Sequence, residues 1–217
     1  LVSDDPAGPC PSVNDNVTIT FDRRPATADG GSNFSVCGST ATLAAVAATN
    51  GGTGTWTGPV GVTFTPSANS PTATANNLAV GANNLTWTVT SALGVCGSTN
   101  EVIVVTRNAV PVNNNQTQQR CVDIPGGSTT VVALTELQAL NDAITGIAGS
   151  TNRTVTFFED AARTDLYDAT ETLSNGAIVY TRVTRTDVAP ACTTDGTVTF
   201  TINARPGVTA QNPEFCE

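Results

Sequence analysis

Six cysteines carry the most reactive side chains of this 217-residue chain. They are Cys10, Cys37, Cys96, Cys121, Cys192 and Cys216. Successive cysteines are separated by 27, 59, 25, 71 and 24 residues, so that short and long intervals alternate. No pair has the C-x-x-C spacing that is typical of metal or redox sites. We therefore expect disulfides, which persist only in an oxidising compartment and predict an extracellular location.

The three short intervals between cysteines are similar to one another. In each, a segment rich in β-branched and apolar residues starts six or seven positions after the cysteine, at residues 17–21, 102–106 and 198–202. A proline follows each segment and ends the strand, because proline cannot donate a hydrogen bond to a sheet. Internal repetition of this kind indicates an array of similar units, whose bodies are the two long intervals.

Each long interval would then be one domain with its own disulfide. This predicts the pairs Cys37–Cys96 and Cys121–Cys192. On the chain-entropy model, closing loops of this size stabilises the fold by roughly 4 kcal/mol per bridge.

The two terminal cysteines have no domain body on one side. Cys10 and Cys216 are therefore predicted to be inter-unit or intermolecular thiols, either in a window of a longer array, which we favour, or in molecules linked head to tail. The strand that follows Cys10 also lacks a body of its own, and it is a candidate for addition to the sheet edge of a neighbouring molecule. Its residues are Val17, Thr18, Ile19, Thr20 and Phe21.

The composition excludes several classes of function. All nine basic residues are arginine, and the chain has no lysine or histidine. Ser-His-Asp and Cys-His catalysis, histidine-ligated metals and Schiff-base chemistry are therefore excluded. The net charge of −9 argues against nucleic acid as a partner. No apolar run approaches the roughly 20 residues that a membrane span requires.

Pairs of carboxylates are the remaining catalytic possibility. Asp4 with Asp5, Glu159 with Asp160, Asp165 with Asp168, and Glu171 could act as glycosidase acid and base, but they fall in predicted turns, where acidic residues are ordinarily solvated. We therefore expect no enzyme and no cofactor. The best acidic cluster gives weak candidates for calcium ligands, without a regular ligand spacing. Its members are Glu159, Asp160, Asp165 and Asp168.

The bodies of both units read as β-structure. In the first, strands are expected at residues 40–46, 53–57, 62–65, 72–78, 84–90 and 100–106. Leu85, Trp87 and Val89 alternate and share one face of a strand. The only two tryptophans, Trp56 and Trp87, are expected to pack between two sheets rather than to form an exposed platform for sugars.

The second body departs from pure β-structure. Leucines at positions 134, 137 and 140 predict a short helix over residues 134–142, which Thr135 or a neighbour could cap and Gly146 would end. Strands follow at residues 154–159, 165–168, 178–184 and 197–203. The sequence thus predicts an all-β chain of two tandem immunoglobulin-like sandwiches, the second with a short helix. The expected segments are an N-terminal strand and linker (1–26), domain 1 (27–109), domain 2 (110–206) and a C-terminal linker (207–217).

Several stretches support this organisation by resemblance. Residues 52–56, 84–90 and 96–99, together with the helix, the strand at 154–158, the acidic alanine-containing turn at 159–162 and the strand at 178–183, resemble tandem Ig-like repeats. Repeats of this kind build long secreted surface proteins and gliding adhesins of Bacteroidota. The resemblance implies type IX secretion, surface display and structural or adhesive work, and it supplies no catalytic residues.

Two functions remain open from the sequence. The leading hypothesis is a structural segment of an extracellular stalk, adhesin or filament, with neighbouring Ig-like domains or copies of itself as partners in a linear array. The alternative is a secreted binding module whose loops recognise surface glycans or a protein ligand.

Overall fold

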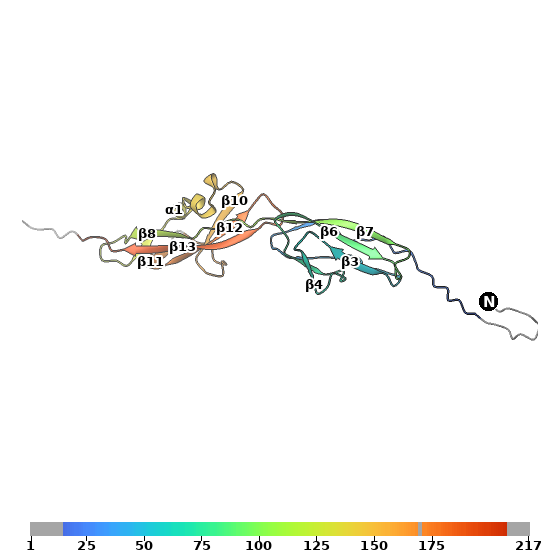
Figure 1. Ribbon diagram of the computed structural model, residues 1–217. Helices are drawn as coiled ribbons and strands as arrows, with labels where there is room; N and C mark the ends of the chain where they lie inside the picture. The colour runs from blue at the N-terminus through green and yellow to red at the C-terminus, as the bar shows by residue number, and fades with distance from the viewer. Residues whose placement is uncertain (1–14, 169–170, 208–217) are drawn as a thin grey trace, which may run out of the picture. The chain divides into compact units, whose positions relative to one another are not determined.

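The computed structural model describes residues 15–168 and 171–207, which fold into two compact units (Figure 1). Unit 1 contains Thr40–Val105 and the described residues up to Phe34. Unit 2 contains Ser35–Ser39 and the described residues from Thr106 onward. The short segment Ser35–Ser39, which the sequence placed within domain 1, therefore belongs to unit 2.

Unit 1 is built on two sheets. A four-stranded sheet has the order β1 (Phe34–Val36), β7 (Ser98–Arg107), β6 (Gly81–Thr90), β3 (Thr53–Thr57), and both β1 and β7 run on into residues that belong to unit 2. A three-stranded sheet has the order β2 (Ala41–Thr42), β5 (Thr74–Asn76), β4 (Thr63–Thr65). Alternate residues of β6 are buried, as expected for a strand with one face on a core.

The core of unit 1 is centred on the two tryptophans. Trp56 and Trp87 are 1% and 0% exposed, and their ring centroids lie 5.1 Å apart, so the prediction that both pack inward is confirmed. Gly54 makes this packing possible, because a Cβ atom at position 54 would lie only 2.0 Å from Cζ2 of Trp87.

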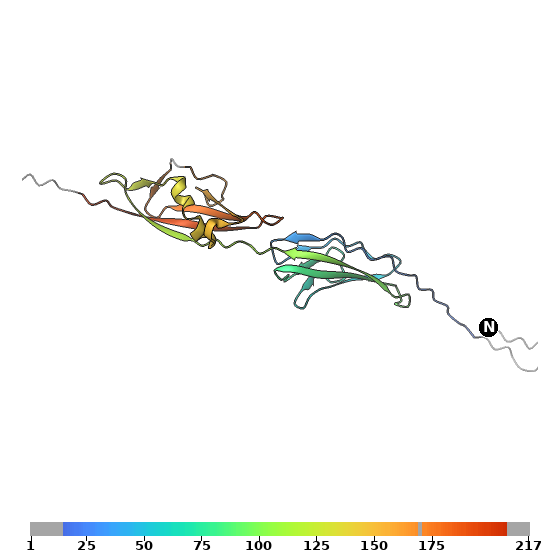
Figure 2. The ribbon, with the colours of Figure 1, turned by 90° about the horizontal axis from the view of Figure 1, so that it is seen from above.

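Unit 2 has a four-stranded sheet of the order β10 (Arg153–Phe158), β12 (Ile178–Arg185), β13 (Thr193–Asn203), β8 (Gln116–Cys121). The β8–β13 pair is parallel and the other two are antiparallel. A separate ladder pairs β11 (Thr172–Ser174) with β9 (Thr129–Val131). Figures 1 and 2 show the helices of unit 2 on one face of the larger sheet. Leu137 and Ile144, one from each α-helix, are fully buried in the unit 2 core.

The helical segment of unit 2 differs from its prediction. Instead of one helix there are α1 (Leu134–Gln138), α2 (Asn141–Thr145) and a 3-10 turn, η1 (Ala148–Ser150). Gly146 ends α2 in the left-handed conformation (φ 67°), as expected. Thr135 is not the N-cap: Ala133 occupies that position and has no side-chain acceptor to offer.

The prediction of an all-β, Ig-like sandwich fold is confirmed. Most predicted strands have a counterpart in the structure. Residues 165–168 are an exception, since they form only an isolated bridge between Leu166 and Phe158. Among the described residues, no helix is long and apolar enough to cross a membrane.

Candidate functional site

A disulfide joins Cys37 to Cys192, with 5.5 Å between the Cα atoms, and both residues lie in unit 2. Cys192 is buried, whereas Cys96 and Cys121 are free thiols on the surface. The predicted pairs Cys37–Cys96 and Cys121–Cys192 are therefore wrong, and so is the expectation of one disulfide for each domain.

The positions of the cysteines along β13 explain why Cys121 cannot bond Cys192. Cys192 directly precedes the first residue of β13, whereas Cys121 is in register with Asn203, the last residue of that strand. A strand of 11 residues is roughly 36 Å long, and a disulfide needs Cα atoms about 4.4–6.8 Å apart. The parallel pairing of β8 with β13 thus sends the two sulfurs to opposite ends of the strand.

The same arrangement along β7 separates Cys37 from Cys96. Cys96 lies two residues before β7 begins. Val36, which precedes Cys37, accepts a hydrogen bond of 2.8 Å from the backbone N–H of Asn108, just past the other end of β7. The ten residues of β7 span roughly 33 Å, so no bond between these cysteines is possible.

Ionic groups hold the hairpin that carries Cys192, defined here as residues 186–192. Asp187 forms ion pairs with Arg185 (Nη2 to Oδ2, 2.7 Å) and with Arg153 (Nη1 to Oδ1, 3.3 Å). The hydrogen bonds from Arg185 lower the pKa of Asp187 to about 2. The backbone N–H of Arg185 also donates to the carbonyl of Cys192 at 2.9 Å. These contacts hold the hairpin at its start and at its cysteine.

A single carboxylate holds the corresponding hairpin of unit 1, residues 91–97. Asp22 accepts hydrogen bonds from the hydroxyl of Ser91 (2.7 Å) and from the backbone N–H groups of Leu93 (3.2 Å), Val95 (2.9 Å) and Cys96 (2.9 Å). The bond from Cys96 is the largest of the causes that lower the pKa of Asp22. Sequence reasoning missed Asp22, because one acidic residue in a loop has no pattern to reveal it.

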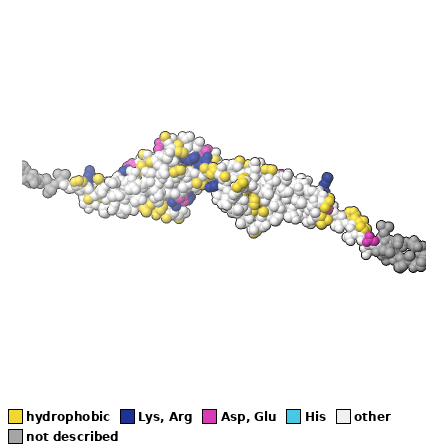
Figure 3. All heavy atoms as spheres, viewed as in Figure 1, with side chains coloured by type: hydrophobic (Ala, Val, Ile, Leu, Met, Phe, Trp, Pro, Cys, Tyr) yellow, Lys and Arg dark blue, Asp and Glu magenta, His cyan; other side chains and the backbone are white. Residues whose placement is uncertain are grey.

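The residues just before Asp22 are exposed. Val17, Ile19 and Phe21 are 76%, 71% and 86% exposed, in an extended segment that belongs to none of the strands. Figure 3 shows hydrophobic side chains gathered where the described chain begins. From Asp22 onward the segment is tied to unit 1, where Thr99 Oγ1, for example, donates to the carbonyl of Ala26 at 2.7 Å. Addition of residues 17–21 to another sheet remains a prediction.

The acidic residues that were weak candidates for calcium ligands instead accept hydrogen bonds from the backbone of their own loop. Asp160 Oδ1 accepts the backbone N–H groups of Thr164 (2.9 Å) and Asp165 (2.8 Å), which lower its pKa, the bond from Asp165 most. Glu159 Oε1 accepts the backbone N–H of Asp168 at 3.0 Å. Within residues 15–168 and 171–207, no three histidine, cysteine or acidic side chains are grouped so that they could hold a metal. Asp4, Asp5, Cys10 and Cys216 lie outside the described residues.

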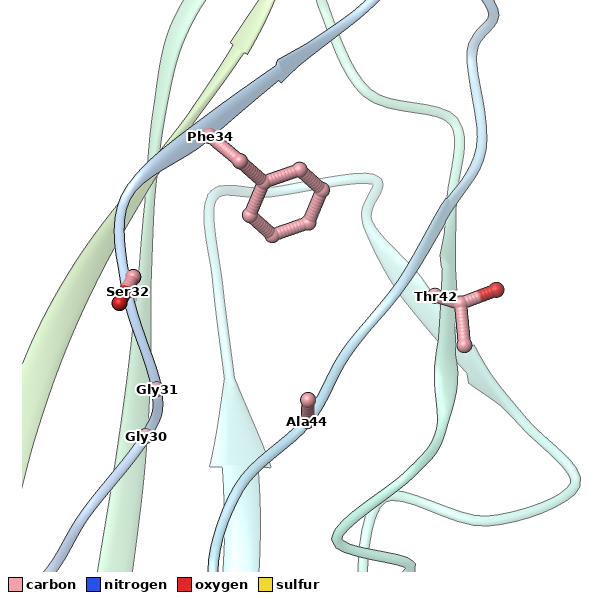
Figure 4. A pocket seen from close by; sticks show the side chains of 6 residues that line it. All are labelled: Gly30, Gly31, Ser32, Phe34, Thr42 and Ala44. Carbon is pink, nitrogen blue, oxygen red and sulfur yellow. The ribbon is translucent and has the colours of Figure 1, made fainter.

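A shallow groove of about 440 Å³ opens on unit 1 (Figure 4). It runs between the segment that leads into β1 and the segment that contains β2, and Phe34 forms its largest side wall. Its lining carries two hydroxyl groups and no ionisable side chain, so the groove has no catalytic acid or base of its own. The lining residues are Gly30, Gly31, Ser32, Phe34, Thr42 and Ala44.

Comparison with known proteins yields fold-level likenesses alone. No family model and no curated protein matches the chain. Among solved structures, it is similar to the insect immune protein hemolin (11% identity, TM-score 0.41, covering 93% of this chain and 55% of hemolin). It is also similar to the Ig1–2 module of the Drosophila receptor tyrosine phosphatase DLAR (10% identity, TM-score 0.29, covering 84% of this chain and 100% of that chain). Human CDH23 EC21–23 is similar as well (12% identity, TM-score 0.28, covering 82% of this chain and 70% of that chain). Since these TM-scores are below 0.5, the fold rests on the sheets described above, and the chain is not assigned to a family.

Proposed function

We propose that this chain is a structural segment of an extracellular stalk, adhesin or filament built of Ig-like units in series. The observation that carries the proposal is the Cys37–Cys192 disulfide. Cys37 precedes nearly all the strands of unit 1, and Cys192 directly precedes the last strand of unit 2. The bond therefore provides a covalent path that bypasses most of the chain.

The path limits how far the chain can be stretched. A pull on the two chain ends runs through the residues before Cys37, across the sulfur–sulfur bond, and through the residues after Cys192. The residues between the two cysteines, which are 155 positions apart, form a closed loop that cannot add to the end-to-end length. Fully extended, that loop is on the order of 500 Å long, which is the extension that the disulfide withholds.

Other features support the same function. Disulfides persist in oxidising compartments, which favours an extracellular location. Both tryptophans, the side chains best suited to stack on a sugar ring, are buried. A binding module for carbohydrate or a protein ligand therefore finds less support than a structural segment. The resemblance to surface repeats of Bacteroidota agrees with this function and remains a prediction from the sequence.

Single-molecule stretching by the two chain ends tests the proposal. We expect that unreduced molecules never release the extension of about 500 Å, whereas the same molecules release it after reduction, when both units unfold. A variant with Cys96→Ser and Cys121→Ser is the matched control, and it should behave like the original chain in both conditions. Release of the full extension without reduction would overturn the proposed covalent path.

A further inference from the structure

Cys96 and Cys121 form no disulfide, yet each occupies the same place beside its four-stranded sheet as a bonded cysteine occupies beside the other four-stranded sheet. Cys96 lies before the last strand of unit 1 (β7), and Cys192 lies before the last strand of unit 2 (β13). We call these two the hairpin cysteines. Cys121 ends β8, the strand beside β13, and Cys37 follows β1, the strand beside β7. We call these two the opening cysteines.

The segments that approach the two hairpins are repeated as well. Asp22 lies 12 positions after Cys10, and its carboxylate binds the hairpin that contains Cys96. Asn108 lies 12 positions after Cys96, and its Nδ2 is 3.5 Å from the carbonyl oxygen of Ala189, in the hairpin that contains Cys192. Asp22 and Asn108 are thus equivalent in the repeat, and each contacts the hairpin of the sheet that follows it in the chain.

The Cys37–Cys192 bond therefore follows a rule: the opening cysteine beside one four-stranded sheet bonds the hairpin cysteine of the four-stranded sheet that comes next in the chain. We propose that Cys121 and Cys96 are the two halves of the same bond at the next junctions of an array. Cys121 bonds the hairpin cysteine of a following unit, and Cys96 bonds the opening cysteine of a preceding unit. A second copy of this chain supplies both partners. This inference rests on the proposed serial arrangement.

The chemistry of the proposed bond requires an oxidant. Both thiols are exposed, so a partner and an oxidant can reach them. With oxidised glutathione, the thiolate of one cysteine attacks the glutathione disulfide, and the thiolate of the second cysteine then attacks the mixed disulfide. One protein disulfide forms, the sulfur–sulfur bond of glutathione breaks, and two molecules of reduced glutathione leave with the two thiol protons.

A tandem chain made in the register of the repeat provides the test. Arg24-Pro25 and Arg205-Pro206 are equivalent in the repeat, so residues 1–206 of one copy are fused to residues 26–217 of a second copy. Asn203 of the first copy then takes the place of Asp22, and Asn203→Asp restores the carboxylate. Cys10→Ser and Cys216→Ser remove the terminal thiols. The fusion is oxidised with glutathione, and its disulfides are mapped by mass spectrometry of unreduced peptides.

The fusion contains its own control. The rule predicts a bond between Cys121 of the first copy and Cys96 of the second, whereas Cys96 of the first copy and Cys121 of the second have no neighbour and stay open to maleimide. Changing Cys121→Ser in the first copy should release only Cys96 of the second copy to the reagent.

Other results would overturn the inference. One is equal maleimide labelling of Cys96 and Cys121 in both copies. Others are a bond between Cys96 and Cys121 of the same copy, and a bond that joins Cys96 to Cys96 or Cys121 to Cys121. If the new junction bond is absent while both copies keep Cys37–Cys192, the repeated bond is wrong and the proposed function stands. If Cys37 is not bonded to Cys192, the covalent path of the proposed function is wrong as well.

Discussion

Two hairpins of this chain hold a cysteine at the same position and are fastened in different ways. The hairpin between β6 and β7 is held by four hydrogen bonds to the carboxylate of Asp22. The hairpin between β12 and β13 is held by the disulfide to Cys37, in addition to the ion pairs of Asp187. The carboxylate of Asp22 and the sulfur of Cys37 each come from a segment that precedes most of the strands of the unit whose hairpin they hold.

The difference determines what each hairpin responds to. A carboxylate that accepts hydrogen bonds loses them when it is protonated, so this fastening depends on pH. A disulfide is opened by thiol exchange and depends on the redox conditions. Aromatic residues allow the two to be followed separately, since both tryptophans lie in unit 1 and both tyrosines, Tyr167 and Tyr180, lie in unit 2.

Loss of the disulfide should have the largest effect on stability. Cys37→Ser is expected to lower the free energy of unfolding of unit 2, by at most about 5 kcal/mol on the chain-entropy model for a loop of this length. Urea unfolding followed by tyrosine fluorescence measures the change. Cys96→Ser, at the unbonded hairpin position, is the control and should stay within about 0.5 kcal/mol of the original chain. Equal losses in the two variants would contradict the difference between the hairpins.

A substitution in the core should instead lower the free energy of unfolding of unit 1. Gly54→Ala places a Cβ atom against the ring of Trp87 and is expected to cost about 3 kcal/mol, since the neighbouring ring cannot move without disturbing Trp56. Tryptophan fluorescence should report an earlier unfolding transition, while the tyrosine transition of unit 2 stays in place. Thr57→Ser, at the exposed end of β3, is the control. A shift of both transitions by the same amount would mean that the units do not respond separately.

The carboxylate of Asp22 should make unit 1 sensitive to acid. Its pKa in the folded chain is lower than its ordinary value of 3.8, so its contribution is complete above pH 3.8 and is lost as the pH falls through the folded value. Asp22→Asn should reduce the loss of stability of unit 1 in this acid range, as measured by tryptophan fluorescence at a series of pH values. Reduction of the disulfide should leave this pH dependence unchanged. An identical acid response in Asp22→Asn would show that the carboxylate does not hold the hairpin.

The exposed segment before Asp22 should matter least for stability. Ile19→Asn is expected to change the free energy of unfolding by less than about 0.5 kcal/mol, because Ile19 is 71% exposed. If residues 17–21 add to the sheet of another molecule, the variant should lose self-association in sedimentation experiments, as should deletion of residues 1–26. Thr18→Asn, on the opposite face of the segment, is the control. Unchanged association in Ile19→Asn would contradict strand addition.

Local patterns in the sequence predicted much of the fold. The alternation of Leu85, Trp87 and Val89 is the buried face of β6, and Gly146 ends a helix as a residue with positive φ does. These features depend on residues that are close together in the chain, so their periodicity is visible before folding.

The fastening groups could not be predicted in the same way. The parallel pairing of β8 with β13 brings together residues about 80 positions apart, and it moves Cys121 away from Cys192. Asp22 acts on a hairpin that lies about 70 positions further along the chain. Neither register nor a single long-range acceptor has a period in the sequence.

Peptide mapping of the unreduced, thiol-alkylated chain tests the central claim most directly. A linked peptide that contains Cys37 and Cys192, together with alkylated Cys96 and Cys121, is the predicted result. Peptides that join Cys37 to Cys96 and Cys121 to Cys192 would contradict the covalent path through the chain.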